Sequence, residues 1–372
     1  MNSDVILVIV VGTALAFDFT NGFHDTANVV ATSISTRALS PRLAVGFAAV
    51  LNFVGAFISL QVAATIGKGI VEAGAVTPTI IFAGLIGAIC WNLITWYFGL
   101  PSSSSHALIG GVVGATLVAA GGHAVLGDGL VSKVLVPALI APVLAFCVAG
   151  LAILVAYRAV GRLRPGPVSR GFRLGQLLTG GLLALAHGTN DAQKTMGVIT
   201  LALIANGNLS STSFHVPAWV VVASASAIAL GTYTGGWRII RTMGTRIIKM
   251  DPAQGFAAQG AGSAVILAAS HFGYPLSTTH VISGGVMGAG AAKRLSAVRW
   301  GVAGNIVAAW VMTVPAAGAI GGAIYGLTRI FGTGALGPAI VSVMLASLIA
   351  AAFTRRVQRG PRVSPTEAMS GS

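Results

Sequence analysis

The residues best suited to bind ions lie in two short polar stretches inside otherwise apolar sequence. The first stretch covers residues 21–28 and contains Asp25, and the second covers 186–197 and contains Asp191 and Lys194. Because a bilayer makes unpaired charge costly, ionisable residues at membrane depth are candidates for a substrate or ion pathway. Asp25 and Asp191 are therefore the strongest individual candidates for an ion site.

A glycine precedes each aspartate by three residues, Gly22 before Asp25 and Gly188 before Asp191. Glycine allows a membrane helix to break, which would free backbone N–H and carbonyl groups for binding. We therefore expect a helix break at each glycine. The alternative is that each aspartate only caps a half-helix, a role that is compatible with ion binding. Asp18, seven residues before Asp25, could face the same interior.

Lys194 occupies the position in the second stretch that Asn28 holds in the first. An ammonium group there could replace a coupling cation, because it could pair with Asp191 or Asp25 and add positive potential near an anion. The alternative is a lysine that extends its side chain to the membrane surface. Its position three residues from Asp191, deep within the span, weakens that alternative.

Two proline-hydroxyl-histidine stretches could bind an anion: Pro-Ser-Ser-Ser-Ser-His at 101–106 and Pro-Leu-Ser-Thr-Thr-His at 275–280. Serine and threonine directly after a proline cap helices, and the first turn of a helix presents free N–H groups that attract anions. Two such turns that converge would surround one oxyanion without an arginine. Plain capping is the alternative, and His106 and His280 serve either packing or proton transfer. The predicted hydroxyl donors are Ser103, Ser104, Ser105, Ser277, Thr278 and Thr279.

The elements that must position these residues are membrane helices. The 372-residue chain is 55% hydrophobic and 8% charged, with a mean hydropathy of +0.86, which excludes an ordinary soluble domain. Apolar runs of about 20 residues recur without the two-residue alternation of barrel strands, so we predict an all-α polytopic membrane protein. The net charge of +14 lies in short loops, where it marks topology instead of nucleic-acid binding. Cys90 and Cys147 lie in apolar spans and indicate neither a disulfide framework nor a metal cluster.

Eleven candidate elements follow from the apolar runs. The start of the chain lacks the basic region of a cleavable signal peptide, so we expect the first element to be retained. Five basic clusters lie between elements, and all of them fall in the cytoplasm if the N-terminus is outside. The elements at 102–122 and 276–292 are short and glycine-rich, and could be re-entrant hairpins instead of crossings. The candidates are 5–36, 43–64, 77–99, 102–122, 134–157, 174–204, 217–237, 253–274, 276–292, 300–326 and 335–354.

Internal repetition indicates two halves. Residues 77–115 align with 251–289 at constant spacing, and one change of loop length upstream pairs Gly22 and Asp25 with Gly188 and Asp191. Five elements in each half would insert the halves in opposite directions, as in inverted-repeat transporters whose site forms at the membrane midplane. The predicted organisation is an N-terminal repeat at 1–157, a basic cytoplasmic linker at 158–173, an inverted repeat at 174–327, a final transmembrane helix at 328–354 and a disordered tail at 355–372.

Together these motifs resemble those of the inorganic phosphate transporter (PiT) family, and the resemblance covers nearly the whole chain. It rests on the stretches at 21–28 and 187–197 and on the two proline-hydroxyl-histidine stretches. The resemblance implies a secondary transporter for inorganic phosphate, coupled to protons or to sodium. It also implies that the phosphate site includes the hydroxyls at 103–105 and 277–279 with Thr189 and Asn190, and that the coupling-ion site includes Asp25, Asn28, Asp191 and Lys194.

Departures from the family pattern bear on the coupling ion. Sodium-coupled members typically carry a glutamate where Asn52 and Gln259 align, and an amide where Lys194 stands. Fewer oxygen ligands and a fixed cation disfavour sodium sites, so we predict proton symport. The family also includes carriers of neutral complexes of phosphate with a divalent metal, so metal phosphate is an open form of the cargo. No resident metal or other cofactor is predicted.

Two other functions stay open at this point. A sulfate or other oxyanion permease of the same fold would use the same donors, although phosphate keeps a proton at neutral pH that an acceptor such as Asp25 could recognise. An intramembrane lipid-phosphate phosphatase would need an arginine clamp, and the arginines lie in loops or at span ends. We predict a multi-pass protein of the cell membrane that binds phosphate, protons and lipid but no nucleic acid. Its oligomeric state is open, a homo-oligomer included.

Overall fold

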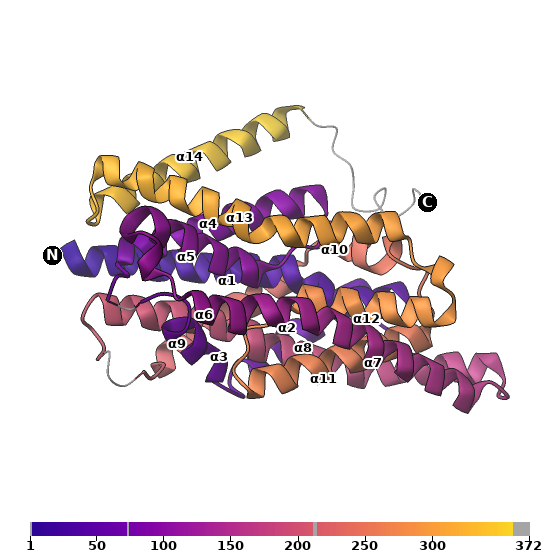
Figure 1. The fold of residues 1–372 in the computed structure, drawn as a ribbon. Coiled ribbons are helices and arrows are strands. Elements are labelled where there is room, and N and C mark those ends of the chain that lie inside the picture. The colour runs from indigo at the N-terminus through magenta and orange to yellow at the C-terminus, as the bar shows by residue number, and fades with distance from the viewer. Residues whose placement is uncertain (1, 73, 211–213, 360–372) are drawn as a thin grey trace.

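The computed structural model describes residues 2–72, 74–210 and 214–359, and helices account for most of them (Figure 1). This confirms the predicted all-α class. The α-helices are α1 (Asn2–Ser35), α2 (Pro41–Gly55), α3 (Gln61–Lys68), α4 (Pro78–Phe98), α5 (Ser104–Ala120), α6 (Gly127–Leu130), α7 (Val136–Val160), α8 (Pro165–Ala205), α9 (Ala218–Thr234), α10 (Trp237–Arg241), α11 (Pro252–His271), α12 (Thr278–Lys293), α13 (Trp300–Phe331) and α14 (Leu336–Arg359). Short 3₁₀ or π segments are η1 (Gly122–Ala124), η2 (Val131–Leu135), η3 (Thr242–Arg246) and η4 (Leu295–Ala297).

Several helices are long and apolar enough to cross a membrane. Within the described ranges these are four helices, or five if α9 and the following α10–η3 segment, bent by 60°, form one span. The other predicted spans coincide with helices that are shorter, such as α5, or that contain more polar residues, such as α8. The four unbroken spans are Asp4–Ser35, Pro78–Phe98, Gly127–Val160 and Trp300–Phe331.

The predicted helix breaks at Gly22 and Gly188 are wrong, because α1 and α8 run through these glycines without interruption. A Cβ atom at Gly22 would meet the carbonyl oxygen of Ile228 in α9, and one at Gly188 would meet that of Asn52 in α2. The glycines therefore permit close contact between helix backbones, which is the usual role of small residues in membrane bundles.

The chain breaks instead in the next element of each half. The predicted span 43–64 is divided into α2 and α3 by the non-helical residues 56–60. In the second half, α9 ends at Gly235, whose φ of +72° is a conformation that favours glycine. Broken helices are thus part of the fold, but they surround the polar stretches instead of containing them.

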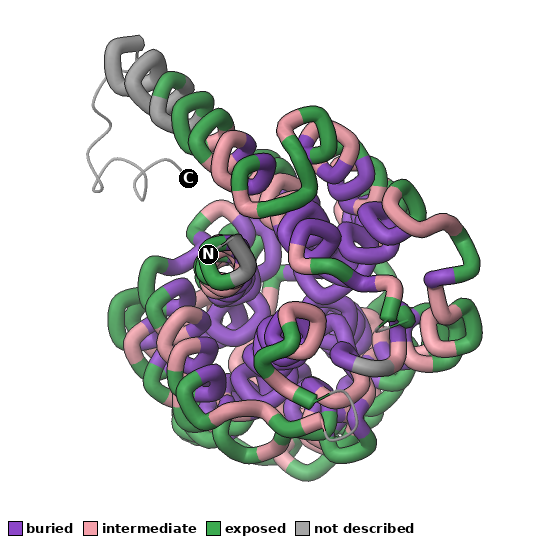
Figure 2. Tube along the Cα trace, turned by 90° about the vertical axis from the view of Figure 1, so that its left-hand side faces the viewer, coloured by how far each residue is buried: buried purple, intermediate pink, exposed green. Residues whose placement is uncertain are grey.

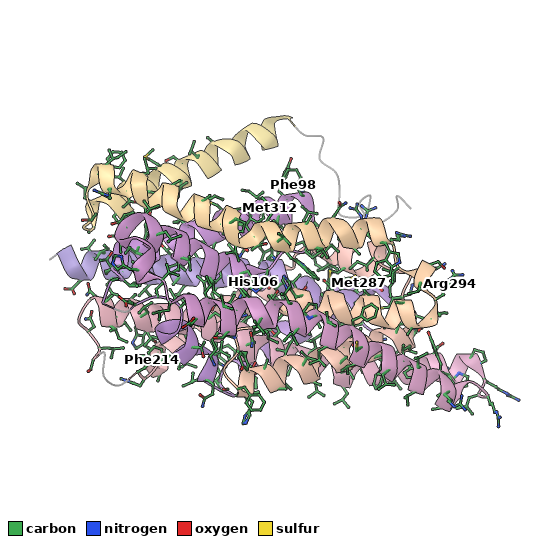
Figure 3. All side chains as sticks on the ribbon, viewed as in Figure 1. Phe98, His106, Phe214, Met287, Arg294 and Met312 are labelled. Atoms are coloured by element: carbon green, nitrogen blue, oxygen red, sulfur yellow. The ribbon has the colours of Figure 1, made fainter. Side chains whose placement is uncertain are left out.

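The two proline-hydroxyl-histidine stretches do begin helices, as predicted. The Ser103 hydroxyl accepts a hydrogen bond from the His106 N–H at 3.1 Å, and the Ser277 hydroxyl accepts one from the His280 N–H at 3.3 Å. His106 lies in the middle of the molecule (Figure 3), and its imidazole ring lies 4.7 Å from that of His280. From this meeting point α5 and α12 extend in opposite directions (Figure 1), so each covers one half of the bundle, which favours the re-entrant alternative.

Helices α5 and α12, which we call the half-helices because each begins at the centre of the bundle, pack closely on the long helices α13 and α7. A Cβ atom at Gly110 of α5 would meet the Val314 carbonyl oxygen of α13, and one at Gly284 of α12 would meet the Pro142 carbonyl oxygen of α7. Gly110 and Gly284 occupy matched positions in the aligned stretches. The same packing therefore occurs twice, and glycine is required at both places because the backbones are in direct contact.

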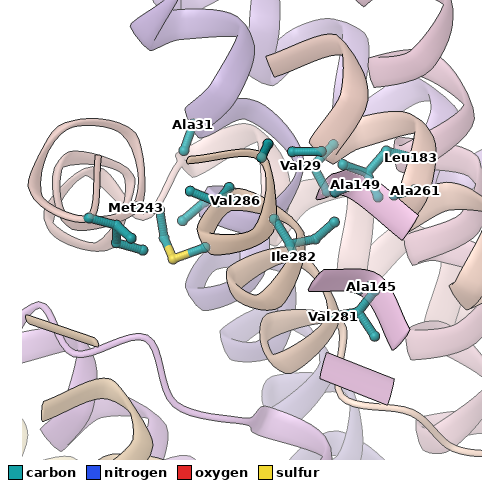
Figure 4. Close-up of a cluster of buried hydrophobic side chains, with 14 of the residues drawn as sticks. Val29, Ala31, Ala145, Ala149, Leu183, Met243, Ala261, Val281, Ile282 and Val286 are labelled. Atoms are coloured by element: carbon teal, nitrogen blue, oxygen red, sulfur yellow. The ribbon is translucent and has the colours of Figure 1, made fainter. Parts of the chain in front are cut away.

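Two hydrophobic clusters lie on either side of the polar centre. One packs α12 against α7, α11 and η3 (Figure 4), and the other packs α5 against α1, α4 and the second half of α8. Buried positions are concentrated along the axis of the bundle (Figure 2). Because α5 and α12 begin at the centre, their polar first turns lie between the two apolar clusters.

The structure bears on some predicted segment boundaries. Helix α7 ends at Val160 and α8 begins at Pro165, so most of the predicted linker at 158–173 is helical. Helix α14 extends to Arg359, and residues 360–372 of the predicted tail lie outside the described residues.

Candidate functional site

Helices α1 and α8 supply the ionisable side chains at the centre. Asp25 and Asn28 are three residues apart on α1, and Asp191 and Lys194 are three residues apart on α8, so each pair shares a helix face. All four side chains are buried, with exposed fractions of 2% for Asp25, 0% for Asp191 and 1% for Lys194. The structure brings together the four residues that the sequence analysis assigned to the coupling ion.

The first turn of α12 joins both aspartates. The Thr278 hydroxyl lies 3.5 Å from Asp25 Oδ2 and 3.4 Å from Asp191 Oδ2, so the two carboxylates share it as a donor. Thr279 Oγ1 lies 3.4 Å from Asp25 Oδ1 and accepts a 2.8 Å hydrogen bond from Asn28 Nδ2. A predicted anion-binding turn is therefore in direct contact with the predicted ion-binding residues.

Lys194 joins α8 to the other half-helix. Its ammonium donates to the Asp191 carboxylate, to the Ser105 hydroxyl and, at 2.8 Å, to the Leu276 carbonyl oxygen. These three oxygens come from α8, from α5 and from the segment before α12. They match the three N–H donors of an ammonium group, so the buried charge is fully satisfied.

Two histidines that the sequence analysis left out also contact the aspartates. His24 Nδ1 lies 2.7 Å from Asp25 Oδ1, and His187 Nε2 lies 3.2 Å from Asp191 Oδ2. The signal was available, because His24 is adjacent to Asp25 and His187 precedes Asp191 by one helical turn.

The hydrogen bonds of Asn52 fix the tautomer of His187. The Thr232 hydroxyl donates to the Ile228 carbonyl at 2.8 Å, so it accepts the 2.8 Å hydrogen bond from Asn52 Nδ2. Asn52 Oδ1 is then the acceptor that faces His187 Nδ1 at 3.2 Å, which requires a proton on Nδ1. His187 Nε2 is left facing Asp191 with either a lone pair or a second proton.

With a lone pair on Nε2, His187 completes a group of possible metal ligands. One ligand atom each from Asp25, His187 and Asp191 lies within 4.8 Å of the others, and all three residues are buried. Two carboxylates and an imidazole suit a first-row divalent ion. No metal cluster was predicted from the sequence, because its cysteine pattern was uninformative and His187 was not considered.

Other predicted site residues have structural partners. Thr189 donates to the Gly55 carbonyl oxygen at 2.8 Å and so joins α8 to α2. Asn190 Nδ2 donates to Ser270 Oγ at 2.8 Å and to the Tyr274 carbonyl at 3.2 Å, which positions the segment before α12. Ser103 and Ser277 are occupied as caps. The buried Ser104 hydroxyl has no hydrogen-bond partner and is free to contact a ligand.

The site is negative before any anion enters. Among the described residues, the buried Asp, Glu, Lys and Arg side chains are Asp18, Asp25, Asp191 and Lys194. At the site itself Asp25, Asp191 and Lys194 sum to a charge of −1 if all three are ionised and the histidines are neutral, and Asp18, which lies farther along α1, would add one more negative charge if ionised. An uncompensated buried charge is strongly unfavourable, so bound positive charge would offset the cost of adding an anion here.

The chain is similar to known transport proteins. The sequence pattern of a family described as "Phosphate transporter family" matches residues 21–321. A Mycobacterium bovis protein named "Probable low-affinity inorganic phosphate transporter" is 54% identical over 96% of this chain and 85% of its own length. Proteins of the same name from Rhizobium meliloti and Bacillus subtilis are 50% and 44% identical, each over 86% of this chain and 96% of their length.

A solved structure shares the fold. It is described as "The sodium-dependent phosphate transporter" and superposes with a TM-score of 0.78, at 27% identity, over 87% of this chain and 99% of its own. The predicted resemblance is therefore confirmed by sequence and by structure.

Proposed function

Since the chain belongs to the phosphate transporter family, we propose that it imports inorganic phosphate by proton symport across the cell membrane. Its family and relatives are transporters and not enzymes, which removes the phosphatase alternative. Several apolar helices make it a multi-pass membrane protein. The direction of transport, the coupling ion and the membrane are our inferences.

The phosphate site is assigned to the first turns of α5 and α12. These turns combine free backbone N–H groups with the hydroxyls of Ser104, Ser105, Thr278 and Thr279, and they meet at the centre of the bundle. Opposed helix N-termini provide positive dipole character from two sides. Among the described residues no arginine is buried, so dipoles and hydroxyls would bind the anion.

The position of Lys194 carries the proposal of proton coupling. Its ammonium lies among three oxygens, from Asp191, Ser105 and Leu276, where a mobile cation would otherwise find ligands. A covalently attached cation cannot be transported. Among the described residues no ammonium or guanidinium is paired with Asp25, whose partner is His24 at 2.7 Å. A proton is the smallest charge that can neutralise Asp25 when phosphate enters.

The experiment is uptake of radiolabelled phosphate into proteoliposomes under separately imposed gradients. An inward proton gradient should drive accumulation above the equilibrium level, and an inward sodium gradient at equal pH should not. A protonophore should abolish the accumulation. Uptake that follows the sodium gradient would contradict proton symport, and empty liposomes control for leakage.

Phosphate in complex with a divalent metal is a second candidate cargo, favoured by the group of Asp25, His187 and Asp191. A divalent ion there would offset the negative charge of the two carboxylates and lie beside the first turn of α12, which contacts both of them. Uptake of ⁵⁴Mn and of ³²P should then rise together, and His187→Gln should reduce the manganese signal. Phosphate uptake that is unchanged by EDTA would exclude this form of cargo.

Sulfate stays the alternative anion, because hydroxyl and N–H groups can donate hydrogen bonds to any tetrahedral oxyanion. Asp25 favours phosphate over sulfate. At neutral pH phosphate keeps a proton that can donate a hydrogen bond to a carboxylate, whereas sulfate keeps no proton. Excess sulfate should leave phosphate uptake unchanged.

The inverted arrangement of the two halves also stays a prediction. It would let the bundle expose this midplane site to each side of the membrane in turn.

A further inference from the structure

Asp18 is a buried carboxyl group outside the site described above. It lies on α1 with 0% of its side chain exposed, and neither of its carboxylate oxygens has a hydrogen-bond partner. The separation of seven positions between Asp18 and Asp25 corresponds to about 10 Å along the helix axis. Asp18 is therefore nearer than the central site to the N-terminal end of α1.

The polar surroundings of Asp18 consist of oxygen atoms that also lack partners. The side chains of Thr195 and Asn21 interact with its carboxyl group. Thr195 Oγ1 and Asn21 Oδ1 are themselves buried without a hydrogen-bond partner of good geometry. The Asn21 amide oxygen and the Thr195 hydroxyl oxygen can each accept a hydrogen bond from a protonated carboxyl group, whereas toward an ionised carboxylate both side chains would have to turn their N–H or O–H groups to Asp18.

A third oxygen lies at the same level in α9. Helices α1 and α9 pack with Gly22 against Ile228, and Thr26 donates to the Thr232 carbonyl oxygen at 3.2 Å. This register places Ser224, one turn before Ile228, beside the turn of α1 that contains Asp18. The Ser224 hydroxyl is also buried without a partner.

Within the described part of the chain, the ammonium group that acts on Asp18 is already paired with another carboxylate. The charged groups that act on Asp18 are Asp191 and Lys194 of α8, and the Lys194 ammonium is already bound to Asp191. Over their described lengths α4 and α9 contain no Asp, Glu, Lys, Arg or His, and α14 has its charges only near its far end, from Arg355. On α1 the nearest titratable groups are His24 and Asp25, which are paired with each other.

We propose that Asp18 is a second proton-binding site and that the proton it carries moves with phosphate. An ionised carboxylate without a free cation or a well-formed hydrogen bond is strongly disfavoured at membrane depth, whereas a protonated carboxyl group can donate to Asn21 or Thr195. The packed arrangement therefore selects the protonated form. This inference rests on the proposed proton symport and adds a binding residue to it.

The link between proton and conformation follows from the same argument. When Asp18 loses its proton, the carboxylate needs water or a cation, and the closed packing of α1, α8 and α9 supplies neither. Release of the proton therefore requires the bundle to open around Asp18. A ligand that binds one conformation better than another shifts the equilibrium by that difference in affinity, and here the ligand is a proton.

The test compares Asp18→Asn with Asp18→Glu in proteoliposomes. Two rates are measured: phosphate accumulation under an inward proton gradient, and exchange of internal for external phosphate without a gradient. We expect Asp18→Asn to lower the ratio of accumulation to exchange by at least about tenfold, within the usual range of coupling between two ligands. Asp18→Glu should restore the ratio. Asp4→Asn, an exposed acid on the same helix, is the matched control and should leave the ratio unchanged.

Protonation itself is measured by infrared difference spectroscopy on the purified protein at neutral pH. The wild-type protein should show the C=O band of a protonated carboxyl group that Asp18→Asn lacks. An unchanged accumulation ratio in Asp18→Asn, or no such band, would overturn the inference. A shift of Asp18 bands on addition of sodium would overturn it in favour of a cation site.

Failure of the proposed symport would look different. If the wild-type protein ignores the proton gradient while the band of Asp18 is present, proton symport is wrong and Asp18 carries a proton that is not transported. If both Asp18 variants lose exchange as well as accumulation, Asp18 has a structural role and the inference is wrong.

Discussion

Helices α1 and α8 make corresponding contacts with the first turns of α12 and α5, but they use different chemical groups. On α1, Asn28 Nδ2 donates to Thr279 at 2.8 Å in the half-helix of the other half of the chain. On α8, Lys194 donates to Ser105, which occupies the position in α5 that Thr279 occupies in α12. One contact uses a neutral amide and the other an ammonium. Asp191 is therefore paired with a covalently attached cation, whereas Asp25 is paired with His24 and, in the proposed mechanism, binds a mobile charge.

Replacing Asp25 of α1 and Asp191 of α8 one at a time should have the largest effect and should distinguish the two helices most clearly. Asp191→Asn leaves a buried ammonium without its counter-charge, and losing one partner of a buried ion pair costs about 3–5 kcal/mol. Asp25→Asn leaves no lysine or arginine without its counter-charge, because the partner of Asp25 is His24. We expect both variants to lose phosphate uptake, and only Asp191→Asn to unfold at a clearly lower temperature in detergent.

The double variant Asp191→Asn/Lys194→Met is the control for this interpretation, since it removes both charges. It should recover thermal stability without recovering uptake. Wild-type uptake in either single variant would contradict the site assignment, and equal stability of the two single variants would contradict the difference in pairing.

Making the two sides alike should have the next largest effect. Lys194→Asn gives α8 the amide of α1 and removes the fixed cation, so Asp191 would need a mobile one. Uptake in sodium-free medium should fall on the order of tenfold and should recover when sodium is added, within the range of ligand coupling energies. Lys249→Asn changes an exposed lysine and serves as the matched control. Sodium-independent uptake at the wild-type rate in Lys194→Asn would refute the role of the ammonium.

The hydroxyls that receive the two contacts should give the smallest effects. Thr279→Ala removes a neutral acceptor and Ser105→Ala removes one that binds a charged donor, and hydrogen bonds to charged groups are about twice as strong. We expect the half-saturating phosphate concentration to rise about fivefold in Thr279→Ala, in line with about 1 kcal/mol for a neutral hydrogen bond. The rise in Ser105→Ala should be larger. Thr279→Ser and Ser105→Thr keep the hydroxyl and should behave like the wild-type protein; an equal response of the two alanine variants would remove the distinction.

Much of the fold and of the site could be predicted from the sequence, because the relevant signals are local. Apolar runs predicted the helices, and serine after proline predicted the caps at Ser103 and Ser277. The spacing of Asp191 and Lys194 predicted their shared face. The alignment of 77–115 with 251–289 indicated which residues correspond, and the matched contacts of Gly110 and Gly284 agree with it.

The features that were missed depend on contacts between distant segments. A glycine in a helix can mark either a break or a close approach, and only the position of the Ile228 carbonyl distinguishes these for Gly22. The division of 43–64 into two helices has no local signal of comparable strength. The isolation of Asp18 depends on what α4 and α9 lack, which becomes relevant only when those helices are placed beside α1.

The division of the anion-binding turns between α5 and α12 has a consequence for turnover. A carrier must release its substrate in every cycle. An arginine clamp, by contrast, would bind phosphate in any conformation. Here α5 and α12 each supply only part of the hydrogen-bond donors that we propose for phosphate. If phosphate binds where we propose, any movement that separates the first turns of α5 and α12 would take the binding site apart, and opening and release would become a single event.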